Sequence, residues 1–154
     1  MIRNGFVLLA VMGITVVASN GWGAEEHGGR PTTRPGNSLH EEMEGMGKAF
    51  KQIKAQAGDA GKNASTLELL AEMEKHTLAA KGMTPRGAAT RPAEEKEKYL
   101  AEFRVDMANA LRLELELEEV IADGENGKAA EAVQAIGNAM GEGHKEFKPK
   151  KKRD

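Results

Sequence analysis

Apolar residues repeat at helical spacing in the stretch 39–53, and this repeat constrains the fold more than any other feature of the sequence. The repeating residues are Leu39, Met43, Met46, Phe50 and Ile53. Intervals of three and four residues place them on one stripe of an α-helix, so the stretch is expected to bury one face. Ser38 precedes it and Glu41 follows three residues later. This is the spacing of a capping box, and it predicts where the helix begins.

Three further segments show the same helical pattern. A second capping box, Ser65 with Glu68, predicts a helix that ends near Lys81, with Gly82 as its C-cap. The next helix is predicted from Pro92 to about residue 122, with the inward stripe Tyr99, Phe103, Met107, Ala110, Leu113, Leu117 and Val120. The last, about 128–147, has the stripe Val133, Ile136, Met140, His144 and Phe147. Four amphipathic helices with short connections predict an all-α, antiparallel up-down-up-down four-helix bundle.

The bundle is expected to cover residues 38–147, with other kinds of segment on both sides. Residues 1–24 have the pattern of a secretory signal with an approximate cleavage site, because Arg3 precedes an apolar run too short for a membrane span. Residues 25–37 are rich in glycine, proline and threonine, which is typical of a flexible tether. Residues 148–154 form a basic tail.

Charge and cysteine content exclude several classes of protein. Residues 1–24 carry one charged residue, Arg3, so their removal changes 22 basic and 24 acidic residues to 21 and 24. A slightly acidic chain of this kind does not fit nucleic-acid binding. Because the sequence has no cysteine, thiolate metal sites, disulfides and covalent haem attachment are excluded. We expect a monomeric periplasmic protein with no integral membrane association after signal cleavage.

The topology brings a methionine and a histidine to the same end of the predicted bundle. The first and last helices of such a bundle run antiparallel side by side, so Met43 is expected to lie level with His144. Tyr99, Phe103 and Phe147 are expected close by. A thioether and an imidazole are a known axial ligand pair for haem iron and raise its reduction potential. With both axial positions filled, electron transfer is the natural chemistry, and we expect no enzymatic activity.

Two other interpretations remain open at this stage. Met43 is also a plausible core residue, and His144 a plausible solvated residue near a helix C-terminus. The spacing of His40, Met43 and Met46 suits Cu(I), so a copper-binding bundle is one alternative. A cofactor-free periplasmic interaction bundle is the other. Glycines beside Met43 and His144 fit either a close approach to the backbone or a frayed helix end.

Several motifs, in their order and spacing, resemble the soluble periplasmic cytochrome b562 family over roughly residues 38–147. They are Glu42-Met43-Glu44, Leu70-x-x-Met73, Thr84-Pro85, Phe103-Arg104, Gly127-Lys128 and Gly143-His144-Lys145-Glu146-Phe147. The resemblance implies one non-covalent haem b (iron protoporphyrin IX) and electron transfer with an unidentified redox protein. It also implies that Met43 and His144 are the iron ligands and that Phe103 packs on the haem.

The haem is expected to be lined by apolar side chains near that end of the bundle. These are Met46, Tyr99, Phe103, Met107, Met140 and Phe147. Met107 stands where the family has a second aromatic residue. His40 and His76 are expected to take no part in iron binding. A group of carboxylates in the third helix is expected to form a solvated face: Glu114, Glu116, Glu118 and Glu119.

Overall fold

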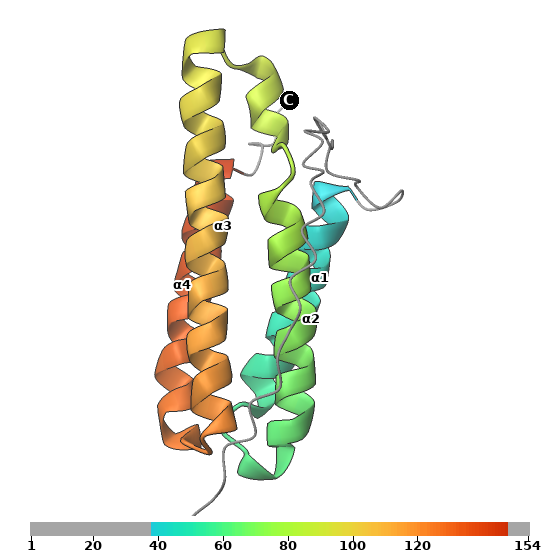
Figure 1. The fold of residues 1–154 in the computed structure, drawn as a ribbon, viewed down its shortest axis with the longest axis vertical. Helices are drawn as coiled ribbons and strands as arrows, with labels where there is room; N and C mark the ends of the chain where they lie inside the picture. Colours follow the sequence, from blue (N-terminus) through green and yellow to red (C-terminus); the bar gives the residue numbers. More distant parts are fainter. Residues whose placement is uncertain (1–37, 148–154) are drawn as a thin grey trace, which may run out of the picture. The chain divides into compact units, whose positions relative to one another are not determined.

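A computed structural model describes residues 38–147 and shows four long helices. They are α1 (Leu39–Gln56), α2 (Asn63–Lys81), α3 (Ala93–Ala122) and α4 (Ala129–Phe147). Short 3₁₀ helices lie in the three connections: η1 (Ala60–Lys62), η2 (Arg86–Thr90) and η3 (Asn126–Lys128). Figure 1 shows successive helices running in opposite directions. Residues 38–147 contain no strand, and the prediction of an all-α four-helix bundle is confirmed.

The predictions for the remaining residues lie outside this range. They concern the signal (1–24), the tether (25–37) and the basic tail (148–154), none of which is among the described residues. None of the helices in residues 38–147 has the length and apolar character needed to cross a membrane.

The predicted start of α1 is confirmed, whereas the predicted start of α2 is wrong. Glu41 N donates to Ser38 Oγ and Ser38 N donates to Glu41 Oε2, which completes the capping box. In α2, by contrast, Ser65 lies inside the helix, and its hydroxyl donates to the Lys62 carbonyl at 3.0 Å. The helix begins earlier because η1, capped by the side chain of Asp59, leads directly into it.

Two asparagines tie together the connections at one end of the bundle. Asn126 Nδ2 donates to Asn63 Oδ1 at 2.8 Å, and Asn63 Nδ2 donates to Asn126 Oδ1 at 3.3 Å. The same amides also reach the backbone carbonyls of Ala57 and Ile121. We call this the closed end. Its hydrogen bonds join the start of α2 to the end of α3 and to η3, and η3 to the end of α1.

The buried face of α1 is rotated relative to the predicted stripe. Met46 and Ile53 are buried as expected, together with Glu42 and Ala49. Three predicted residues, Leu39, Met43 and Phe50, are only partly buried. The stripe predicted from apolar residues alone therefore covers one side of the buried face, and it misses Glu42 on the other side.

The inward stripe of α3 is confirmed over its first half and corrected over its second. Tyr99, Phe103, Met107, Ala110 and Leu117 are buried, whereas Leu113 and Val120 are only partly so. Glu114 and Ile121 take the buried positions instead. The face from Phe103 to Ile121 keeps a regular alternation of four and three residues, so geometry rather than polarity decides which side chain is inside. The predicted solvated position of Glu114 is wrong, while Glu116 and Glu119 are exposed.

α3 is longer than its neighbours and extends beyond them at its N-terminal end. Its 30 residues span about 45 Å, against about 27 Å for the 18 residues of α1. Figure 1 shows the α2–α3 connection lying beside this extension. A side chain at Gly87 of η2 would collide with the Tyr99 hydroxyl, and the Arg91 guanidinium lies 3.9 Å from the centre of the Tyr99 ring. The connection therefore covers Tyr99.

Glu114 is a carboxyl in the middle of the core. Its exposed fraction is 0%, and Thr77 Oγ1 donates to its Oε1 at 2.8 Å. Its Oε2 has no hydrogen-bond partner. Burial raises the pKa of Glu114 to about 7, with the hydrogen bond from Thr77 opposing and the nearby Glu74 adding to the rise. Burial, and then the charge of Glu118, also raise the pKa of Glu74.

Glu114→Gln should remove much of the pH dependence of folding stability. With a pKa raised from 4.5 to about 7, the folded carboxyl keeps its proton where the unfolded one has lost it. Its contribution to stability is full below the unfolded pKa and is lost as the pH rises through the folded pKa. The loss is roughly 3 kcal/mol for a rise of this size. Urea unfolding at about pH 5 and about pH 8 measures it.

The matched control is Glu116→Gln, which changes an exposed carboxyl one half-turn away on the same helix. It should leave the pH dependence of the parent unchanged. The comparison is the change in the free energy of unfolding between the two pH values. If this change is the same in the parent and in Glu114→Gln, the assignment of the raised pKa to Glu114 is contradicted.

Candidate functional site

A contact between Phe50 and Gly137 sets the register of α1 against α4. A Cβ added at Gly137 would lie 3.4 Å from Phe50 Cζ, so the ring packs against the helix backbone. The other neighbouring helix pairs pack extensively, whereas α1 and α4 touch only sparsely. The Phe50–Gly137 contact is therefore informative about how these two helices are aligned.

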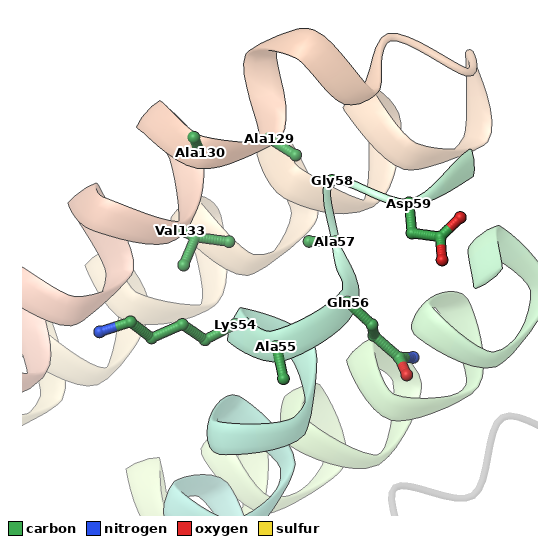
Figure 2. A pocket seen from close by; sticks show the side chains of 9 residues that line it. All are labelled: Lys54, Ala55, Gln56, Ala57, Gly58, Asp59, Ala129, Ala130 and Val133. Carbon is green, nitrogen blue, oxygen red and sulfur yellow. The ribbon is translucent and has the colours of Figure 1, made fainter. Parts of the chain in front are cut away.

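A pocket at the closed end agrees with this register. It has a volume of about 450 Å³ and lies between the end of α1 and the start of α4 (Figure 2). Moving seven residues along each helix from Phe50 and Gly137 reaches Ala57 and Ala130, and both line the pocket. Lys54 and Val133, which the same register pairs, line it too. No predicted site residue is among its lining residues.

The same register aligns Met43 with His144 at the opposite end. Met43 lies seven residues before Phe50, and His144 lies seven residues after Gly137. Seven residues are two helical turns, about 10.5 Å, and return to nearly the same face of a helix. The start of α1 and the end of α4 do lie at the same end of the bundle (Figure 1). We call the α1–α4 boundary between Phe50–Gly137 and Met43–His144 the open seam.

Two glycines, one on each helix, add no side chain to the open seam. Gly47 lies between Met43 and Phe50 on α1, and Gly141 lies between Gly137 and His144 on α4. A Cβ added at Gly47 or Gly141 would meet no atom within 4 Å. Met43 is partly buried, whereas His144 is exposed, so the predicted inward position of His144 on α4 is wrong. The two glycines therefore leave open space at their own Cβ positions.

Three aromatic rings close the core beside this end, as predicted. The ring centres of Tyr99 and Phe147 lie 5.1 Å apart, and those of Phe103 and Phe147 lie 5.2 Å apart. The exposed fractions of these three residues are at most 8%. Met46 and Met107 are buried as well, and Met140 is partly buried. All six predicted lining residues thus lie in the core or at its edge.

The structure separates the three residues proposed for copper. His40 is exposed, whereas Met46 has an exposed fraction of 1% and lies in the core. Met43 lies between these extremes. The three side chains therefore do not share one accessible face.

Sequence reasoning overlooked a polar pair beside Met43. His76 Nδ1 on α2 donates to Glu42 Oε2 on α1 at 2.5 Å. The imidazole lies over Gly45 of α1, where it occupies the space that a side chain would need. Gly45 therefore faces α2, whereas Gly47 faces the open seam. Small residues at Gly45 and Ala49 flanking the buried Met46 were the available signal for a close helix approach here.

Acidic residues border the same end on α3 and α4. Burial raises the pKa of Asp106, and the neighbouring charges of Glu142 and Glu102 raise it further. In residues 38–147, no three histidine or acidic side chains lie together as a group able to hold a metal ion.

Comparison with known proteins identifies a family for the bundle. A family model described as cytochrome b562 matches residues 38–148, which include the whole described bundle. No curated protein and no solved structure matches the chain. The family is one of haem-binding electron-transfer bundles, and its match covers most of the chain. The chain belongs to the cytochrome b562 family.

Proposed function

We propose that this protein is a periplasmic one-electron carrier that binds one non-covalent haem b through Met43 and His144. The observation that carries the proposal is the α1–α4 register. The Phe50–Gly137 contact implies that Met43 and His144 lie level with each other across the open seam. An electron-transfer haem commonly has two protein ligands to its iron, and a thioether with an imidazole is a suitable pair.

The residues around the seam fit a flat apolar group. Gly47 and Gly141 add no side chain to the seam, and the space at their Cβ positions is open. The aromatic cluster of Tyr99, Phe103 and Phe147 provides an apolar wall at the same end. Because the sequence contains no cysteine, a haem held here is bound through its iron and by packing alone.

The haem would supply the one-electron change between ferric and ferrous iron. Met43 and His144 would keep both axial positions filled, which denies a site to oxygen or a substrate. The methionine sulfur favours the ferrous state and so raises the reduction potential. Met46, Met107 and Met140 would line the apolar surroundings that exclude water.

The cellular setting is part of the proposal. The signal-like pattern of residues 1–24 supports export to the periplasm. The reaction needs a second redox protein as electron donor or acceptor. The bundle would work as a monomer, since one chain supplies both ligands.

Exchanging each ligand for alanine tests the proposal. Purified parent protein should take up one equivalent of haem and show the sharp α and β bands of low-spin iron on reduction. His144→Ala should abolish this low-spin spectrum. Met43→Ala should keep haem but give a high-spin or water-ligated iron with a lower potential, because water replaces the soft thioether. Visible absorption spectra and a redox titration measure both effects.

His40→Ala is the matched control, because this histidine is exposed on the same turn as Met43. Its spectrum should equal that of the parent. Retention of the parent spectrum in both Met43→Ala and His144→Ala would overturn the ligand assignment. Absence of haem uptake together with tight Cu(I) binding by the parent would favour a copper protein instead.

Filling the open seam should block haem without unfolding the bundle. Gly141→Leu places an isobutyl group where the structure has free space, so the haem-free protein should remain folded. The same group would occupy part of the haem position and weaken haem binding by roughly tenfold or more, as expected for overpacking of a site. Haem titration followed by absorbance measures affinity, and circular dichroism measures folding.

Asn138→Leu provides the control for added bulk on the same helix, since position 138 is exposed. It should bind haem like the parent. If Gly141→Leu and Asn138→Leu bind haem equally well, the haem does not lie in the open seam.

A further inference from the structure

The open end of α1 is attached to α2 by the Glu42–His76 pair. The His76 Nδ1 to Glu42 Oε2 distance is 2.5 Å, and the exposed fractions of the two side chains are 21% and 7%. A hydrogen bond between groups so shielded from water is costly to break, because water can replace it only in part. The pair therefore couples the second turn of α1 firmly to α2.

The absence of a side chain at Gly45 lets the imidazole of His76 pack directly against α1. A Cβ added at Gly45 would lie 2.5 Å from His76 Nε2, 2.6 Å from Cε1 and 2.7 Å from Cδ2. Real Cβ atoms do not approach other atoms so closely, so a side chain at this position would displace the ring. Gly45 follows Glu42 by three residues and lies on the same helix face. Glu42 and Gly45 thus hold His76 from two directions.

This attachment matters because the other side of α1 is weakly held at this end. α1 touches α4 only sparsely, and no atom lies near a Cβ position at Gly47. The first turn of a helix frays readily unless caps or tertiary contacts hold it. The capping box of Ser38 and Glu41 secures the local turn, but it does not attach that turn to another helix.

The pair also fixes which way Met43 faces. Successive residues of an α-helix are rotated by about 100° around its axis. With Glu42 held against α2, Met43 is turned away from α2 and toward the side of α1 where Phe50 meets α4. A small rotation of α1 would move the Met43 sulfur along with the backbone.

We infer that Glu42, His76 and Gly45 form a positioning latch that holds Met43 in place for ligation of the haem iron. These residues do not touch the haem; they act through the position of α1. The inference rests on the proposed function, since it assumes that Met43 is a ligand. It predicts that opening the latch loosens the iron–sulfur bond specifically.

Carbon monoxide is a probe for that bond, because it binds ferrous iron only where Met43 has left. His76→Ala in the haem-loaded ferrous protein should raise the apparent affinity for carbon monoxide by roughly tenfold, since a ligand that is less firmly held is displaced more easily. Met43→Ala alone should raise it at least as much. In the Met43→Ala background, His76→Ala should add nothing, because the latch then has no sulfur to position.

Variants at Gly45, against which the His76 ring packs, provide an independent test. Gly45→Ala should raise carbon monoxide affinity like His76→Ala, because the added methyl group displaces the imidazole. In the His76→Ala background the same Gly45→Ala change should be harmless, since the colliding ring is gone. His76→Asn, which keeps a donor near the place of Nδ1, should restore part of the parent behaviour and covers the case in which His76→Ala folds poorly.

Asn126→Ala is the matched control. It breaks a comparable polar tie at the closed end and should lower stability without changing carbon monoxide affinity. The latch is overturned if His76→Ala and Gly45→Ala leave carbon monoxide affinity at the parent value, or raise it equally in the Met43→Ala background. The proposed function itself fails, and the latch with it, if Met43→Ala leaves carbon monoxide affinity unchanged.

Discussion

The contact of Phe50 with Gly137 is the constraint on which the site depends. The Phe50 ring of α1 packs against the backbone of α4 at Gly137. The two helices therefore approach each other closely at this level and less closely on either side of it along the bundle axis. The pocket lined by Ala57 and Ala130 lies on one side of this level, and the open seam lies on the other. Because antiparallel helices keep their register over two turns, one contact aligns both. A larger residue at position 137 would push α4 away from α1 and move both walls of the seam.

Much of this architecture could be predicted from sequence, because helical spacing is a local signal. The four helices follow from the three-and-four-residue intervals of apolar side chains. The placement of the start of α1 and the end of α4 at the same end of the bundle (Figure 1) follows from connection lengths, since short turns force neighbouring helices to run antiparallel. The cluster of Tyr99, Phe103 and Phe147 follows from the same topology. None of these steps needs a contact between specific side chains.

The rest could not be predicted, because it depends on partners distant in the chain. Glu114 is a typical exposed helix residue until Thr77, 37 positions earlier, is found beside it. His76 likewise has no apparent role until Glu42, 34 positions earlier, accepts its hydrogen bond. The observed start of α2 differs from the predicted one for a local reason. The sequence offers a capping box at Ser65, but the 3₁₀ helix capped by Asp59 already leads into α2 before that residue. Polar residues in the core are thus where sequence patterns are least informative.

The polar contacts of α2 have a consequence for how the helices can move. Asn63, His76 and Thr77 each bond to another part of the chain, to Asn126, Glu42 and Glu114 respectively. Sliding α2 by one turn would break all three bonds together. Apolar packing alone tolerates such a slide, because one methyl group can replace another. The polar contacts of α2 therefore fix its position along the bundle axis relative to the other helices. Other axial registers of α2 would be unfavourable.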